Sequence, residues 1–176
     1  MSETTFVKSR VMPYIPEICK GIDVGFGNDK IREDFIGADK EKPYTGGLNF
    51  KVDMVCDITV GLPCPDNSFD VVYSSHLIED FIDTQKILKE FIRAGKDGGR
   101  LILVFPDQIK YEEDCKRRGT TTNPHHKVRE MGVSYMIEEI KKTGQLELLT
   151  SFEMPPYNCI VIADIRKTTS LTETTY

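Results

Sequence analysis

The sequence lacks a long hydrophobic run, and no apolar stretch approaches the ~18–20 residues that a membrane-spanning helix requires. Its first ten residues, MSETTFVKSR, also lack the apolar core of a secretory signal peptide. The five cysteines are scattered and contain no C-x-x-C pair, so neither a zinc-ligand cluster nor an even disulfide framework is indicated. We therefore expect a cytoplasmic protein with free thiols and no metal site.

An excess of basic charge is also absent. The chain carries 23 lysines and arginines against 28 aspartates and glutamates, a net charge of −5 at pH 7. This balance does not favour binding to nucleic-acid phosphates. With 176 residues, 39% hydrophobic and 29% charged, the composition is typical of one soluble globular domain. We expect that domain to span residues 1–167, followed by a disordered polar tail at 168–176.

Strand and helix patterns alternate along the chain. Most predicted strands are apolar on both faces, which indicates a parallel sheet covered by helices on each side. The last two strands are separated by only PPY, a connection too short for a crossover, so they must pair antiparallel. We predict a three-layer, doubly wound (Rossmann-like) α/β fold with a mostly parallel seven-stranded sheet, in which the strand at 159–166 is inserted antiparallel. The predicted strands are 19–25, 35–40, 51–59, 69–76, 97–106, 146–154 and 158–167, and the predicted helices are 28–35, 83–95 and 133–144.

Acidic residues end three successive predicted strands. In an open parallel sheet these ends share one edge, where ligands bind. Asp23, Asp39 and Asp57 occupy them, and Gly25 and Gly27 follow the first, where a missing Cβ lets a ligand lie against the backbone. The alternative for each acid is a turn former or a helix cap. Together with the Gly-x-Gly turn, the three acids favour a ligand that carries a nucleoside.

The first turn lacks the third glycine of a dinucleotide-binding G-x-G-x-x-G pattern. Asp29, at the start of the predicted helix, would also repel a pyrophosphate. A cofactor without phosphates suits this turn better, and S-adenosylmethionine is one, with cationic groups that favour acidic surroundings. Asp39 would then accept hydrogen bonds from the ribose hydroxyls and Asp57 from the adenine amino group. A nucleotide-dependent oxidoreductase stays open as a weaker alternative.

From about residue 20 to 167 the chain resembles the class I S-adenosylmethionine-dependent methyltransferases, especially those with the methyltransferase domain 11 pattern. GIDVGFGND resembles the first motif of that family, GADK the second strand and VCDIT the third, while LPCPDNSFDVVYSSHLIEDF is the closest match. The resemblance implies the same fold and cofactor. It also implies cofactor-binding roles for Asp23, Gly25, Gly27, Asp39, Asp57, Ile58, Ser74 and Ser75.

Three features depart from the family pattern. Asp29 stands where a third small residue is usual, and a loop at 40–51 replaces a helix that many members keep between the second and third strands. The segment before the first strand is too short for the lid helices that commonly close over the cofactor. We expect the long polar segment at 107–131 to replace them, folding over the pocket as an acceptor-binding lid.

Three histidines are the candidates for a general base, because imidazole titrates nearest neutral pH. They are His76, which falls beside the expected methionine site, and His125 and His126, in the predicted lid. The alternatives are packing near the cofactor for His76 and a surface position for the other two. Glu79 and Asp80 are interpreted as caps of the following helix. The basic run at 116–118 suggests an anionic acceptor.

These observations favour a methyltransferase that acts on a small-molecule or sugar-like acceptor. YSSH replaces the N/D-P-P-Y/F signature of amino-directed nucleic-acid methylation after the fourth strand, which argues against bases as acceptors. The main alternative is a catalytically weak or inactive cofactor-binding protein that acts as a partner or regulatory subunit. A homodimer is an equally open form of assembly.

Overall fold

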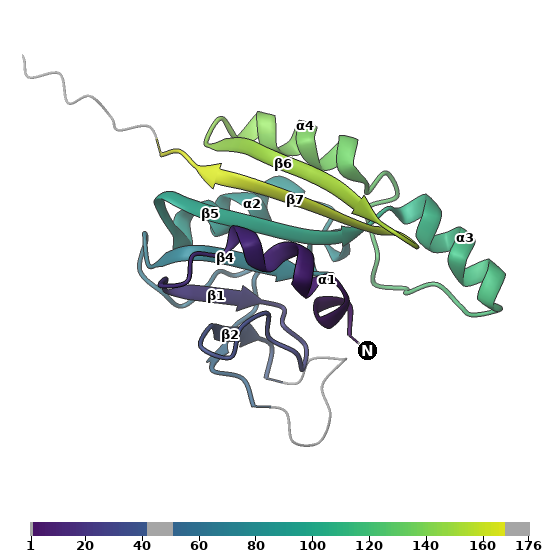
Figure 1. Ribbon diagram of the computed structural model, residues 1–176, viewed down its shortest axis with the longest axis horizontal. Coiled ribbons are helices and arrows are strands. Elements are labelled where there is room, and N and C mark those ends of the chain that lie inside the picture. Colours follow the sequence, from purple (N-terminus) through teal and green to yellow (C-terminus); the bar gives the residue numbers. More distant parts are fainter. Residues whose placement is uncertain (1, 42–50, 168–176) are drawn as a thin grey trace, which may run out of the picture.

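The computed structural model describes residues 2–41 and 51–167. The predicted tail at 168–176 and most of the predicted loop at 40–51 lie outside these ranges. The described chain forms one seven-stranded sheet of order β3-β2-β1-β4-β5-β7-β6 (Figure 1). Its strands are β1 (Gly21–Val24), β2 (Ile36–Asp39), β3 (Met54–Val55), β4 (Phe69–Ser75), β5 (Gly95–Pro106), β6 (Leu146–Met154) and β7 (Asn158–Ile165).

The pairing confirms the predicted topology. Strands β3, β2, β1, β4 and β5 pair parallel, whereas β7 runs antiparallel to both of its neighbours, β5 and β6. From β1 the chain adds β2 and β3 on one side of the sheet and then returns to place β4 on the other side of β1. The carboxyl ends of β1 and β4 therefore flank the point where the strand order reverses, and open sheets bind ligands at this point. All five cysteines are free thiols.

Helices cover both faces of the sheet (Figure 1). The helices α2 (Thr84–Ala94) and α4 (Val133–Thr143) pack on one face, where Ile87, Phe91 and Met136 join the apolar side chains of the strands. The helix α1 (Glu3–Val11) covers the other face through Val7 and Val11. The described part of the chain contains no helix with the length and hydropathy required to cross a membrane.

The helix predicted at 28–35 is wrong. This segment forms turns and bends, because its side chains and backbone amides bind other parts of the chain instead of completing a helical ladder. The Arg32 guanidinium donates to the carbonyls of Pro16 and Glu17, and the Ile31 amide donates to the Asp23 carboxylate. The third strand is also shorter than predicted, since β3 contains only Met54 and Val55 and ends before Asp57.

One helix in the polar segment at 107–131 was not predicted. The helix α3 (Gln108–Arg118) begins at Asp107, whose carboxylate accepts from the Lys110 amide, and ends at Gly119 in the left-handed region with φ +68°. It has no continuous apolar stripe, since its buried residues are Gln108, Asp114 and Cys115. The hydrophobic periodicity that reveals other helices is therefore missing here.

Gly21 gives a direct test of how closely β1 approaches its neighbours. A Cβ at this position would lie 2.2 Å from the Phe35 ring. We expect Gly21→Ala to lower the free energy of unfolding by about 1–3 kcal/mol, because the ring must move within a packed core. Urea unfolding measures the change. Gly132→Ala is the control, since its Cβ would meet no atom closer than 4.0 Å, and an equal loss in both variants would contradict the prediction.

Candidate functional site

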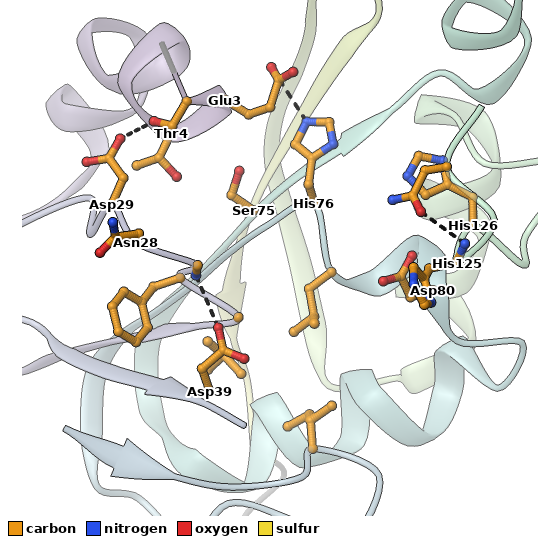
Figure 2. Close-up of a pocket in the computed structure, with 18 of the residues that line it drawn as sticks. Glu3, Thr4, Asn28, Asp29, Asp39, Ser75, His76, Asp80, His125 and His126 are labelled. Atoms are coloured by element: carbon orange, nitrogen blue, oxygen red, sulfur yellow. Dashed lines mark hydrogen bonds and ion pairs between the residues drawn. The ribbon is translucent and has the colours of Figure 1, made fainter. Parts of the chain in front are cut away.

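A pocket of about 970 Å³ opens at the carboxyl ends of the parallel strands. We call it the strand-end pocket. Its walls come from the loops after β1, β2 and β4, the first turn of α1, and the segment from Tyr111 to Lys127 (Figure 2). Four acidic residues line it, namely Glu3, Asp29, Asp39 and Asp80, and all are half-buried. The lysines and arginine of the lining, Lys40, Arg118 and Lys127, are exposed, so the interior of the pocket is more acidic than its rim.

The turn after β1 forms the floor of this pocket. Gly25 and Gly27 have positive φ angles of +72° and +60°, which a residue with a Cβ rarely adopts. The Gly25 amide donates to the Ala38 carbonyl, a contact that joins the turn to β2. A Cβ on Gly25 would also lie 2.9 Å from the side chain of Leu77. The turn itself therefore requires both glycines, and their contact with a cofactor stays a prediction.

Asp23 lies beneath this turn and does not line the strand-end pocket. It is fully buried, and one carboxylate oxygen accepts from the Ile31 amide at 2.8 Å. Burial raises the pKa of this carboxyl to about 8, against the lowering effect of that hydrogen bond. The structure thus gives Asp23 a supporting position below the glycine turn, and a direct role in cofactor binding stays a prediction.

Asp39 lines the strand-end pocket at the end of β2. Its carboxylate accepts from the Gly27 amide at 3.1 Å and from the Lys40 amide at 2.7 Å, as the dashed line in Figure 2 shows for the first of these contacts. Burial raises its pKa. Each carboxylate oxygen has a further lone pair, so Asp39 can accept hydrogen bonds from a pair of hydroxyl groups.

The remaining residues of the predicted cofactor set divide into two groups. Ile58 and Ser75 line the strand-end pocket. Ser74 and Asp57 are not among its lining residues. The buried Ser74 hydroxyl donates to the Val24 carbonyl at 2.9 Å, and the Asp57 carboxylate accepts from the amide and hydroxyl of Thr59. The Asp57 side chain is therefore bound to its own turn, and the adenine contact stays a prediction.

Asp29 binds the start of α1. Its carboxylate accepts from the hydroxyls of Ser2 and Thr5, and Ser2 is itself the N-cap of the helix. Burial alone would raise the pKa of Asp29, but these hydroxyls lower it. An acid at a helix N-terminus is favourable. Two expectations are thus corrected: Asp29 does not begin a helix that follows β1, and the segment before β1 does supply a helix at the mouth of the pocket.

Replacing Asp29 with alanine should loosen α1 locally. The change removes two hydrogen bonds to a charged acceptor and the favourable charge at the helix N-terminus, together about 1–2 kcal/mol at a half-exposed site. Hydrogen exchange of the α1 amides should become roughly tenfold faster or more, while the amides of β5 keep their protection. Glu33→Ala, an exposed acid outside the pocket, is the control. Unchanged exchange in α1 would contradict this account.

A buried carboxylate lies behind two of the predicted histidines. Glu79 is fully buried, and its Oε1 is 3.3 Å from His76 Nδ1 and 3.7 Å from His126 Nε2. We call these three residues the Glu79 cluster. Glu79 is therefore not the cap of the next helix, because Asp83 caps α2 through the Lys86 amide. Sequence reasoning missed this role, although the spacing of His76 and Glu79 places both in the turn after β4.

His76 is held as an imidazolium. It adopts the left-handed region with φ +51°, and its Nε2 lies 2.7 Å from Asn158 Oδ1, so that nitrogen donates. Burial would lower the pKa of His76, but Glu79, Glu3 and Asn158 raise it to about 9. His126 differs, because burial and the neighbouring His76 and His125 lower its pKa despite the attraction of Glu79.

The Glu79 cluster is connected to α1 by hydrogen bonds. The carboxylate of Glu3, in the first turn of α1, accepts from the Tyr157 hydroxyl at 2.8 Å and from Asn158 Nδ2 at 3.1 Å. Its Oε2 also lies 3.9 Å from His76 Nε2, the ion pair drawn in Figure 2. Glu3, Tyr157 and Asn158 carry no signal in the sequence, because they meet His76 only through the tertiary fold.

The segment at 107–131 contributes one wall of the strand-end pocket. Tyr111, Arg118, His125 and His126 all line it. The basic run at 116–118 is partly neutralised, however, because both Arg117 and Arg118 pair with the buried Asp114. This pairing weakens the argument for an anionic acceptor, which stays a prediction. A lid role for the segment remains a prediction.

One group of potential metal ligands occurs among the described residues, outside the strand-end pocket. The ligand atoms of Asp107, Glu153 and Cys159 lie within 4.8 Å of one another. The Lys110 ammonium group pairs with both carboxylates and therefore already supplies the positive charge that a metal ion would bring to this group.

Comparison with known proteins finds a family match over part of the chain. The model of a methyltransferase domain matches residues 22–103, from β1 into β5. Over this region the chain is similar to the class I S-adenosylmethionine-dependent methyltransferases. It is 29% identical over 140 residues to a "Probable S-adenosylmethionine-dependent methyltransferase" of Mycolicibacterium smegmatis, covering 72% of this chain and 52% of that one. It is also 31% identical over 86 residues to ajmaline N-methyltransferase of Rauvolfia serpentina, covering 49% of this chain and 27% of that one.

The chain spans about half or less of the length of these methyltransferase relatives. A solved structure with the same fold is the complex between the Trm112 methyltransferase activator of Haloferax volcanii and a methyltransferase, with a TM-score of 0.65 and 14% identity over 93% of this chain and 94% of that one. At this identity the likeness shows the fold alone.

S-adenosylmethionine is the cofactor that this methyltransferase family implies. The strand-end pocket fits it in two respects. Positive φ angles at Gly25 and Gly27 leave bare backbone on the floor, and Asp39 offers carboxylate lone pairs to hydroxyl donors. The half-buried acids of the lining also suit a ligand with a sulfonium and an ammonium group.

Proposed function

We propose that this chain transfers a methyl group from S-adenosylmethionine to a small-molecule or sugar-like acceptor in the strand-end pocket. The observation that carries the proposal is the half-buried Asp39 carboxylate beside the Gly25–Gly27 turn, inside the region that matches the methyltransferase family. Ligands of open α/β sheets bind at this edge. The volume of about 970 Å³ leaves room for an acceptor beside a cofactor.

S-adenosylmethionine supplies an activated methyl group when bound. The residues of the chain then position and desolvate the reactants, which is the main catalytic contribution available for an in-line displacement. Asp39 would hold the ribose hydroxyls, and Ile58 would pack against the adenine. Ser75 and His76, after β4, would flank the methionine part.

Neither nitrogen of His76 is free for an acceptor, because they face Glu79 and Asn158. His126 donates through Nδ1 to Gln108 Oε1, because the amide nitrogen of Gln108 already donates to Glu112. Its Nε2 lies 3.7 Å from the Glu79 carboxylate, too far for a hydrogen bond. The role that we propose for His76 is therefore to shape the pocket and set its charge. A general-base role for one of the three histidines stays a prediction.

Equilibrium titration and turnover test the proposed function. S-adenosylmethionine should bind the chain with higher affinity than NADH or ATP, and S-adenosylhomocysteine should accumulate when an acceptor is present. Preferential binding of NADH would instead support the oxidoreductase alternative. Binding of S-adenosylmethionine without turnover over a broad acceptor panel would favour a catalytically weak or inactive partner or regulatory subunit.

The adenine contact predicted for Asp57 has its own test. Asp57→Ala should weaken S-adenosylmethionine binding if the carboxylate leaves Thr59 to accept the adenine amino group, by about tenfold for one charge-assisted hydrogen bond. Calorimetric titration measures it, with Asp34→Ala as an exposed control outside the pocket. Unchanged affinity would show that Asp57 only stabilises its own turn and does not bind the adenine.

A further inference from the structure

One end of the strand-end pocket combines a carboxylate with aromatic rings. Tyr157 and Tyr111 meet edge to face with their centroids 5.1 Å apart, and the Tyr111 centroid is 4.8 Å from that of His126. The His76 ring meets Tyr157 at 6.3 Å, also edge to face. Glu3 lies at the edge of this wall, bonded to the Tyr157 hydroxyl. A carboxylate together with aromatic rings is an arrangement that can recognise ammonium ions.

Glu3, Glu79 and His76 together carry a negative charge. Glu3 and Glu79 contribute two carboxylates, and the imidazolium of His76 contributes one positive charge, which leaves one negative charge in this group. Arg118 also lines the pocket, but it is exposed and pairs at 2.7 Å with Asp114, a carboxylate that it shares with Arg117. A cationic ligand beside Glu3 would therefore balance this group, whereas an anion there would meet an uncompensated carboxylate.

Glu3 is well placed to provide the compensating contact. Its carboxylate is held by two uncharged donors, Tyr157 and Asn158, and among the described residues its nearest cationic nitrogen, on His76, is 3.9 Å away. The Glu3 side chain keeps 37% of its surface exposed. Its oxygens thus retain lone pairs toward the pocket. Behind the wall, the buried charge of Glu79 offsets the repulsion that His76 alone would exert on a second cation.

We propose that the acceptor is an amine, bound as its ammonium between Glu3 and the ring of Tyr157. This inference rests on the proposed function and narrows its acceptor class. The bound ammonium loses one proton to the Glu3 carboxylate, which passes it to solvent. The freed nitrogen lone pair forms the bond to the methyl carbon while the carbon–sulfur bond breaks, and that electron pair returns to sulfur as a thioether. The product is the N-methylammonium ion.

A matched set of probes tests the amine subsite. The full chain, loaded with S-adenosylhomocysteine, is titrated at pH 7 with 2-phenylethylamine, 2-phenylethanol and 3-phenylpropionate, which share a ring and differ in charge; benzylamine and tyramine extend the amine series. We expect at least one amine to bind tenfold or more tightly than the alcohol and the carboxylate. Equal or tighter binding of the alcohol or the carboxylate would overturn the inference, and so would the absence of binding by all three amines.

Two variants assign the subsite to its residues. Glu3→Gln should weaken amine binding about tenfold and leave the alcohol within about twofold, and Tyr157→Leu should do the same even if the Glu3 variant folds poorly. Glu33→Gln is the matched exposed control. Unchanged amine affinity in both pocket variants would overturn the inference. Titration with S-adenosylmethionine alone distinguishes a failure of the proposed function from a failure of the amine subsite. If S-adenosylmethionine does not bind, the proposed function is rejected. The phenyl probes that differ in charge, titrated without cofactor, still test the amine subsite.

Discussion

Replacing Glu79 with alanine should lower the free energy of unfolding at pH 7 by about 3–5 kcal/mol, the usual cost of leaving a buried charge without its partner. Glu79 is fully buried, and its carboxylate faces the imidazoles of His76 and His126. Without it, the protonated form of His76 loses its closest counter-ion. Urea unfolding measures the change, and Glu33→Ala, at an exposed position, should stay within about 0.5 kcal/mol of the parent chain.

The same pair predicts how stability depends on pH. The pKa of His76 is about 9 in the folded chain, above its ordinary value of 6.5, so protonated His76 stabilises the fold. This contribution is complete below pH 6.5 and is lost as the pH rises through 9, a change of about 3 kcal/mol. The other titratable groups that face His76 are Glu3 and, through Glu79, His126.

Glu79→Gln should remove most of this pH dependence between pH 6.5 and 9, since the charge that raises the pKa of His76 is gone. Titration of the His76 ring by NMR gives an independent reading. A pKa near 6.5 in the parent chain, or equal pH slopes in the parent and the variant, would contradict the assignment of the Glu79–His76 ion pair.

Replacing Asp39 with alanine should weaken S-adenosylmethionine binding tenfold or more. The carboxylate is expected to accept two ribose hydroxyls, and hydrogen bonds to a charged group contribute about 1.5–3 kcal/mol. Calorimetric titration measures the affinity of Asp39→Ala and of Asp39→Asn, which keeps the size of the side chain and removes its charge. Because Asp39 also accepts from the Gly27 amide, thermal unfolding must show that both variants remain folded.

Asp34→Ala is the control for this series, because Asp34 is exposed and lies outside the strand-end pocket. An affinity of folded Asp39→Ala within twofold of the parent chain would show that the ribose binds elsewhere.

The sheet could be predicted from the sequence because its signals are local. Exposing an apolar run such as LILVF in β5 to water would cost free energy, so such runs predict buried strands. The short PPY connection permits only antiparallel pairing of β6 and β7. The position of Asp39 beside the Gly25–Gly27 turn could be predicted as well, because the carboxyl ends of the strands in one parallel sheet lie at one edge.

Two of the errors in helix prediction, those at 28–35 and at α3, have a common cause. The composition of the turn at 28–35 is typical of a helix. However, Asp29 and Arg32 form hydrogen bonds with residues distant in the sequence, including Ser2 and Pro16. The helix α3 lacks an apolar stripe and is formed by its caps and by ion pairs within its own turns, such as Asp114 with Arg118. Periodicity detects burial of one face, and neither segment is governed by it.

The part of the candidate site that was missed depends on contacts between distant segments. Glu3, Glu79 and Asn158 converge on His76 from α1, the turn after β4 and the start of β7. Nothing in the local sequence of these residues reveals the arrangement. It could be found only once the sheet order had placed β4 and β7 on either side of β5.

A crystal structure of the chain with S-adenosylhomocysteine would test the central claim most directly. The account predicts the ribose hydroxyls within hydrogen-bond distance of the Asp39 carboxylate, the adenine beside Ile58, and the sulfur directed toward Ser75 and His76. Density for the ligand outside the strand-end pocket, or a ribose turned away from Asp39, would contradict it.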